Sequence, residues 1–227
     1  MTTTFEAPPL YRTTIGKKVL VAVTGILGLG FILAHMVGNL HAFEGPSQLN
    51  HYGDWLRSIG EPALPRSLFL WIMRVVLLGA LIIHVTLTAQ LAMRSRASRR
   101  SRYGDHEIVQ ASYASRTMRW GGVAILLFLI WHLMDLSWGV PAHFIRGDVY
   151  DNVVQSFDNV PNTLIYVLAS FALGMHLYHG TWSVFQTLGV NRARWDSSIR
   201  KLAVTIALVV GIGFAAVPVA VLAGVIS

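Results

Sequence analysis

Residues 19–40 read VLVAVTGILGLGFILAHMVGNL, a predominantly apolar stretch of 22 residues in which His35 is the only ionisable side chain. A helix rises about 1.5 Å per residue, so this stretch is about 33 Å long and can cross the roughly 30 Å hydrocarbon core of a bilayer. It therefore predicts a membrane-spanning helix. A histidine inside such a helix is costly to bury, which makes it a candidate functional residue.

Four more stretches have this length and character, near residues 68–93, 120–138, 163–188 and 202–226. The 227 residues are 54% hydrophobic and 13% charged, with a mean hydropathy of +0.54, whereas soluble domains carry about 25% charged residues. We therefore predict an all-α, polytopic membrane protein whose residues 1–227 form a single transmembrane domain with five helices. The sequence has no cysteine, which excludes disulfides and thiolate-held zinc or iron–sulfur clusters.

The loops that join the predicted helices differ in charge between the two sides. The N-terminal segment and the loops after the second and fourth helices carry 14 basic and four acidic residues, against three basic and six acidic residues on the other side. The positive-inside rule places the N-terminus in the cytoplasm and the C-terminus outside. Because the basic residues flank membrane spans, we expect them to face anionic membrane lipids or a docked soluble subunit, and we expect no nucleic-acid partner.

Histidines occur in four of the five predicted helices, as His35, His84, His132, and His176 with His179. Counted along each helix, His35 and His132 lie roughly 6–9 Å below the outer surface, and His84 and His176 roughly 22–26 Å below it. Two histidines at each of two depths is the pattern of two stacked bis-histidine haems. His179, one turn after His176, is an alternative ligand or a packing residue, and a lone histidine can also serve as an interhelical hydrogen-bonding contact.

This pattern predicts an outer haem iron held by His35 and His132 and an inner haem iron held by His84 and His176. An iron with two protein ligands has no open position for oxygen, so the predicted role is electron transfer. Glycines along the first four helices are typical of close packing between membrane helices, which we favour over contact with a macrocycle.

Two charged residues within the predicted helices allow several interpretations. Arg74 lies one to two turns inside the outer end of the second helix, where it would bind a haem propionate or extend to the outer interface. Asp135 follows His132 by three residues and would cap the third helix, pair with Arg74 or handle a quinone proton. The residues alone do not decide between these roles.

With these features the chain resembles, over nearly its whole length, the di-haem cytochrome b membrane anchor of succinate dehydrogenases and fumarate reductases that have one large, five-helix anchor polypeptide. Residues 25–40, GILGLGFILAHMVGNL, resemble the family's first helix, in which a histidine is followed by an asparagine. Residues 175–182, MHLYHGTW, resemble its fourth helix. The resemblance assigns the ligand role on this helix to His176 and leaves His179 outside the coordination shell.

The resemblance implies two haem b groups and a complex in a bacterial cytoplasmic membrane. A flavoprotein subunit would act on succinate or fumarate, and an iron–sulfur subunit would dock on the cytoplasmic face, nearer to the inner haem. The seven arginines within residues 94–119 would suit that docking surface. The electron acceptor would be a quinone, typically menaquinone, and further small membrane subunits are compatible with the family.

Three other functions remain open from the sequence. The nearest is the cytochrome b anchor of another quinone-linked enzyme, such as a hydrogenase or a formate dehydrogenase. The second is a proton-coupled transporter with histidine relays, which is disfavoured because the sequence lacks an inverted repeat and paired broken helices. The third is a structural anchor without a cofactor. A b-type haem spectrum separates both cytochrome functions from the other two.

Overall fold

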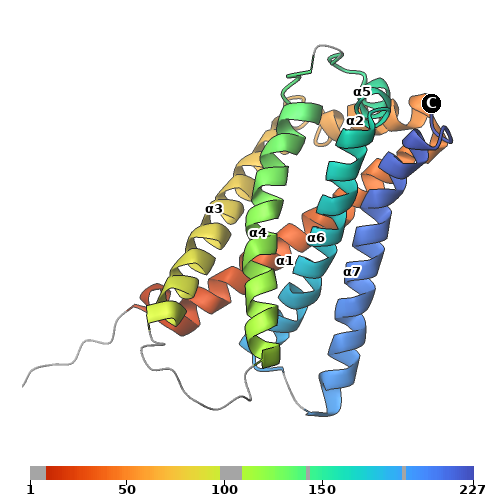
Figure 1. Ribbon diagram of the computed structural model, residues 1–227. Helices are drawn as coiled ribbons and strands as arrows, with labels where there is room; N and C mark the ends of the chain where they lie inside the picture. The colour runs from red at the N-terminus through yellow and green to blue at the C-terminus, as the bar shows by residue number, and fades with distance from the viewer. Residues whose placement is uncertain (1–8, 98–108, 142–143, 191–192) are drawn as a thin grey trace, which may run out of the picture.

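The computed structural model describes residues 9–97, 109–141, 144–190 and 193–227, which fold into an elongated bundle of helices (Figure 1). Its five long helices are α1 (Thr14–Leu40), α3 (Leu68–Ala97), α4 (Val109–Leu136), α6 (Val160–Thr187) and α7 (Ala193–Leu222). Each contains a stretch long and apolar enough to cross a membrane, and the described residues contain no strand. The predicted all-α polytopic membrane fold is therefore confirmed.

The long helices extend beyond the apolar stretches that predicted them. α1 begins at Thr14 where residue 19 was expected, and α7 begins at Ala193 where residue 202 was expected. Backbone hydrogen bonds hold a helix together whether its side chains are apolar or polar, so the polar first turns continue the same helix. The start of α1 is fixed by Thr13, whose side chain accepts a hydrogen bond from the Gly16 amide at 3.0 Å.

Two short helices at one end of the bundle were not predicted. α2 (Pro46–Ser58) and α5 (Val149–Phe157) lie together at the end where the chain terminates (Figure 1). Asn50 of α2 joins them, because its side-chain oxygen accepts from the Val149 amide at 2.8 Å and its nitrogen donates to Asp148 at 3.0 Å. Their sequence signals are a proline in the first turn of α2 and the N-cap Asp148 of α5.

The bundle is apolar on its outside and partly polar within, as expected for a protein surrounded by lipid. Large apolar side chains on four different helices are well exposed, among them Val75, Leu127, Phe171 and Ile212. Among the described residues, the buried positions instead include eight polar or charged side chains, four of them on α6. The long helices therefore present their most hydrophobic surfaces to the bilayer.

Close packing of α6 against α7 organises the centre of the bundle. A Cβ atom at Gly174 of α6 would lie 3.0 Å from the Ala207 carbonyl oxygen of α7, so only a glycine allows this approach without a shift. α1 packs against α3, α6 and α7, and α4 packs against α6. This arrangement places the four histidine-bearing helices around a shared interior.

Candidate functional site

The outer histidine pair joins α1 to α4. The ring centroids of His35 and His132 are 5.9 Å apart, and their planes are inclined by 73°. His35 stacks on Phe31 at 5.4 Å with an interplanar angle of 8°, and it lies 5.8 Å from the ring of Phe214 on α7. His132 lies 5.9 Å from the ring of Phe128. The pair is therefore held in aromatic surroundings contributed by three helices.

The inner pair joins α3 to α6. The ring centroids of His84 and His176 are 6.4 Å apart, with an interplanar angle of 61°. Each ring also lies against a glycine of a neighbouring helix: a Cβ at Gly25 of α1 would be 3.5 Å from His84 Cε1, and one at Gly122 of α4 would be 3.8 Å from His176 Cε1. His176 Nδ1 is buried and has no hydrogen-bond partner among the described residues.

The hydrogen-bond contacts around His84 favour one position for the proton on its ring. Its Nδ1 lies 3.1 Å from Thr24 Oγ1. The single hydroxyl hydrogen of Thr24 already points to backbone carbonyls one turn earlier, at Leu20 (2.8 Å) and Val21 (3.1 Å). With the hydroxyl donating to these carbonyls, the threonine oxygen accepts from His84 Nδ1–H, and the Nε2 lone pair would be free to bind a metal.

A tyrosine hydroxyl accepts a hydrogen bond from the His132 ring, as Thr24 does from His84. Its Nδ1 lies 3.4 Å from the hydroxyl oxygen of Tyr166 on α6. That hydroxyl donates its only hydrogen to Asp135 Oδ2 at 2.8 Å, so its oxygen accepts from the imidazole. His132 therefore also presents a free Nε2 lone pair.

Asp135 is the centre of a buried polar cluster at the outer end of α4. The side chain is 6% exposed, and its Oδ2 accepts hydrogen bonds from Ser156 Oγ at 2.6 Å and Asn162 Nδ2 at 3.1 Å as well as from Tyr166. Trp131 Nε1 donates to the carboxamide oxygen of Asn162 at 2.9 Å. These contacts connect α4 to α5 and α6, whereas the sequence had left a helix cap, an ion pair with Arg74 and a quinone-proton role open.

The ring spacing of each histidine pair is compatible with one metal ion bound between the two rings. Metal–imidazole bonds are about 2 Å long and a ring nitrogen lies roughly 1 Å from the ring centre, so the two centroids should be roughly 6 Å apart. The observed values are 5.9 and 6.4 Å. The described residues contain no group of three or more His, Cys, Asp or Glu that could hold a metal ion. A haem iron takes four nitrogens from its porphyrin and needs only two from the protein, so these residues fit a haem.

The two remaining candidates, His179 and Arg74, make contacts other than the ring pairing. His179 contacts the ring of its neighbour Tyr178 at 5.1 Å, and the ring that faces His84 is that of His176. Arg74 is exposed, and its guanidinium lies 4.8 Å from the centroid of the Trp71 ring. Its binding of a propionate stays a prediction.

The sequence did not single out the polar partners of the histidines, Thr24 and Tyr166, or the cluster residues Ser156 and Asn162. One signal could have found two of them. Asn162, Tyr166 and Ser170 recur every four residues and form a polar stripe along one face of an otherwise apolar helix. Ser156 lies in α5, a helix that was not predicted, and Thr24 is the only hydroxyl residue in the apolar stretch 19–40, so neither belongs to such a stripe.

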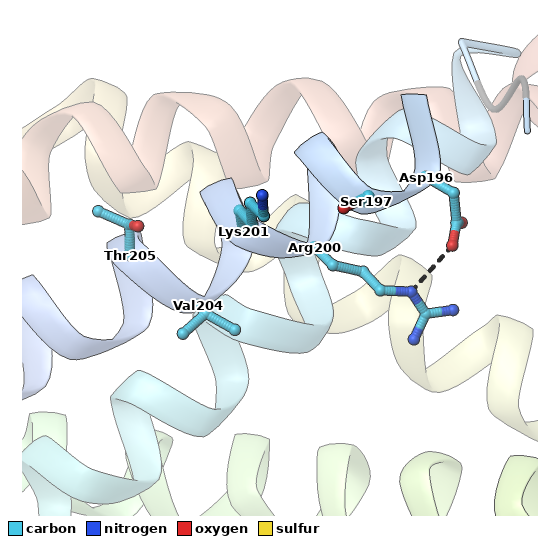
Figure 2. Close-up of a pocket in the computed structure, with 6 residues that line it drawn as sticks. All are labelled: Asp196, Ser197, Arg200, Lys201, Val204 and Thr205. Carbon is cyan, nitrogen blue, oxygen red and sulfur yellow. Dashed lines mark hydrogen bonds and ion pairs between the residues drawn. The ribbon is translucent and has the colours of Figure 1, made fainter. Parts of the chain in front are cut away.

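A shallow groove lies on the first turns of α7, and none of the histidines lines it. Its lining residues are Asp196, Ser197, Arg200, Lys201, Val204 and Thr205 (Figure 2). Arg200 Nε donates to Asp196 at 3.0 Å, and its guanidinium lies 4.5 Å from the ring centroid of Trp182 on α6. The groove is therefore lined mainly by charged and hydroxyl side chains, with Val204 as its one apolar residue, at the end of a membrane-spanning helix.

Comparison with known families agrees with this architecture. The family model of the succinate dehydrogenase/fumarate reductase transmembrane subunit matches residues 90–215, which include His132 and His176 and make up more than half of the chain. Comparison with curated proteins and with solved structures gives no match. Five apolar helices and a match of this extent lead to one assignment: the chain belongs to the family of succinate dehydrogenase/fumarate reductase transmembrane subunits.

Proposed function

We propose that this chain is the di-haem cytochrome b subunit of a succinate:quinone oxidoreductase. In this proposal His35 and His132 hold an outer haem b, and His84 and His176 hold an inner one. The chain would receive electrons from a docked iron–sulfur subunit and deliver them to a quinone, with menaquinone as the expected type. The observation that carries the proposal is the arrangement of four histidines on four helices as two facing pairs.

The hydrogen bonds of the pairs support the ligand assignment. His84 and His132 each use Nδ1 as a donor to a hydroxyl oxygen, which leaves Nε2 available and holds the ring in one orientation. Their partners in each pair, His176 and His35, approach from the opposite helix. When bound, a haem with two such ligands supplies reversible one-electron transfer. The chain itself would supply two histidine nitrogens to each haem and, through Thr24 and Tyr166, the orientation of one ring in each pair.

The proposed orientation places the basic ends of the helices in the cytoplasm of a bacterial cell, where the flavoprotein and iron–sulfur subunits would dock. Arg94, Arg96 and Lys201 are exposed at this end, and the short helices α2 and α5 lie at the opposite one (Figure 1). Residues 98–108, which carry several of the arginines expected to contribute to docking, lie outside the described part of the chain. The positive-inside rule supports this orientation.

The proposal is tested by the haem content of the purified protein. A dithionite-reduced minus oxidised spectrum, with haem quantified per chain, should give two b-type haems. His84→Ala and His176→Ala should each remove the same haem, and His35→Ala and His132→Ala the other one. A purified protein without haem, after expression with haem supplied, would refute the proposal.

His179→Ala is the matched control, because it removes a histidine from the same helix one turn from His176. It should leave both haems in place. If His179→Ala lost a haem and His176→Ala kept both, the ligand assignment on α6 would be wrong. If all four single replacements left two haems bound, the pairs would not be the ligands.

A further inference from the structure

The two histidine pairs differ in the hydrogen-bond partner of one ring. The partner of His84 is a neutral threonine hydroxyl that itself donates to backbone carbonyls. Behind His132 stands the Tyr166 hydroxyl, which donates to the buried carboxylate of Asp135. Among the described residues, only the outer pair is thus connected to an acidic side chain through a single bridging group.

We propose that Tyr166 and Asp135 form a relay that lowers the reduction potential of the outer haem relative to what its two histidines alone would give. This inference rests on the proposed function, because it assumes that His132 is an axial ligand. Neither residue touches the haem-binding nitrogen itself. Both act through His132, so they are positioning residues for the ligand.

The physical argument follows the direction of the hydrogen bonds. Oδ2 of Asp135 accepts from Tyr166, Ser156 and Asn162, an acceptor-only pattern that suits a carboxylate. The carboxylate orients the tyrosine hydrogen away from His132 and polarises the hydroxyl, which makes its oxygen a better acceptor. A stronger hydrogen bond from Nδ1–H increases the basicity of the imidazole as a ligand, and a more basic ligand stabilises the oxidised iron.

The cluster also has a structural role, from which the relay must be distinguished. Asp135 connects α4 to α5 through Ser156 and to α6 through Asn162 and Tyr166. A purely structural cluster would affect folding or haem retention when it is broken. A relay would instead change the reduction potential of one haem while both haems stay bound.

The test is a potentiometric titration of the purified full-length protein at fixed pH, followed by the haem absorbance. His35→Ala identifies the outer haem as the wave that disappears. Tyr166→Phe and Asp135→Asn should each move the outer wave to a more positive potential and leave the inner wave in place. Because both residues act in one chain of hydrogen bonds, the double variant should shift the outer wave no further than the larger single shift.

Tyr178→Phe is the matched control, since it removes a tyrosine hydroxyl from the same helix beside His179. It should move neither wave. Three outcomes would overturn the relay. The outer wave could stay in place in both Tyr166→Phe and Asp135→Asn, both waves could shift equally, or the shifts could be additive in the double variant. Loss of the outer haem in both single variants would overturn it too, because the pair would then be a scaffold.

These results separate the relay from the proposed function. A wild-type protein that binds no haem refutes the proposed function before any variant is made. If the wild-type protein binds two haems and neither substitution changes the potential of the outer haem, only the relay is refuted.

Discussion

Replacing Thr24 by valine isolates the hydrogen bond that orients the inner ligand ring. Valine has nearly the same shape as threonine but no oxygen, so His84 Nδ1–H loses its 3.1 Å acceptor. A neutral hydrogen bond contributes about 0.5–1.5 kcal/mol, and about 1.4 kcal/mol corresponds to 59 mV for a one-electron couple. Nδ1–H is the stronger donor when the iron is oxidised, so we expect the inner haem potential to rise by at most about 60 mV.

The assay is the potentiometric titration described above, with two control variants. Thr24→Ser keeps the hydroxyl and should keep the potential. Thr88→Val removes a hydroxyl one turn after His84 that donates to the backbone oxygens of His84 and Val85 and not to the ring. The reasoning is refuted if Thr88→Val shifts the inner wave as far as Thr24→Val does, or if Thr24→Ser and Thr24→Val shift it equally.

Two further predictions concern stability, each measured by thermal unfolding of the purified protein. Gly174→Ala should lower the free energy of unfolding by about 1–3 kcal/mol, because its Cβ would meet a backbone oxygen of α7 at 3.0 Å. Gly28→Ala is the control and should not destabilise the protein, because no atom lies within 4 Å of its Cβ. Equal effects of the two substitutions would contradict the packing argument. Hydrogen bonds from the Asp151 amide and the Asn50 side chain lower the pKa of Asp148. The ionised carboxylate therefore stabilises the folded protein above the ordinary carboxyl pKa of about 4, and this stabilisation is lost as the pH falls through the lowered pKa. Asp148→Ala should remove that part of the acid sensitivity, and an unchanged pH profile would contradict it.

The long helices could be predicted from the sequence because lipid imposes one simple requirement on them. A span must carry about 20 mostly apolar residues, and hydropathy measures that property directly. The short helices α2 and α5 lie outside the apolar stretches, where no such requirement applies. Their formation depends on contacts between distant segments, such as Asn50 of α2 with the first turn of α5, which hydropathy does not detect.

The histidine pairing was accessible from the sequence for a similar reason. Depth in the membrane follows from counting residues along a helix, and the depth argument pairs the same rings that the structure places side by side. Rotation about the helix axis does not follow from counting. The contacts of Thr24 with His84 and of Tyr166 with His132 depend on that rotation, and this is why they emerged only from the structure.

Family membership narrows the functions that the sequence left open. It favours the succinate dehydrogenase/fumarate reductase anchor over the hydrogenase or formate dehydrogenase anchor and the transporter. The matched residues 90–215 contain one histidine of each pair, His132 and His176. The assignment of their partners therefore depends on the structure, in which His35 faces His132 and His84 faces His176.

The two histidine pairs are built alike, and the way they differ would make the two proposed haems unequal. In each pair one ring donates Nδ1–H to a hydroxyl oxygen, while the other ring is held against an aromatic side chain or a glycine. Four identical ligands would by themselves give two similar sites. The Thr24 hydroxyl donates to backbone carbonyls, whereas the Tyr166 hydroxyl donates to a carboxylate. The hydrogen-bond partners of the histidines therefore distinguish the two sites. In the proposed di-haem protein, a difference in electron affinity across the membrane therefore requires no difference in coordination, only an acidic side chain placed two hydrogen bonds away from one ligand histidine.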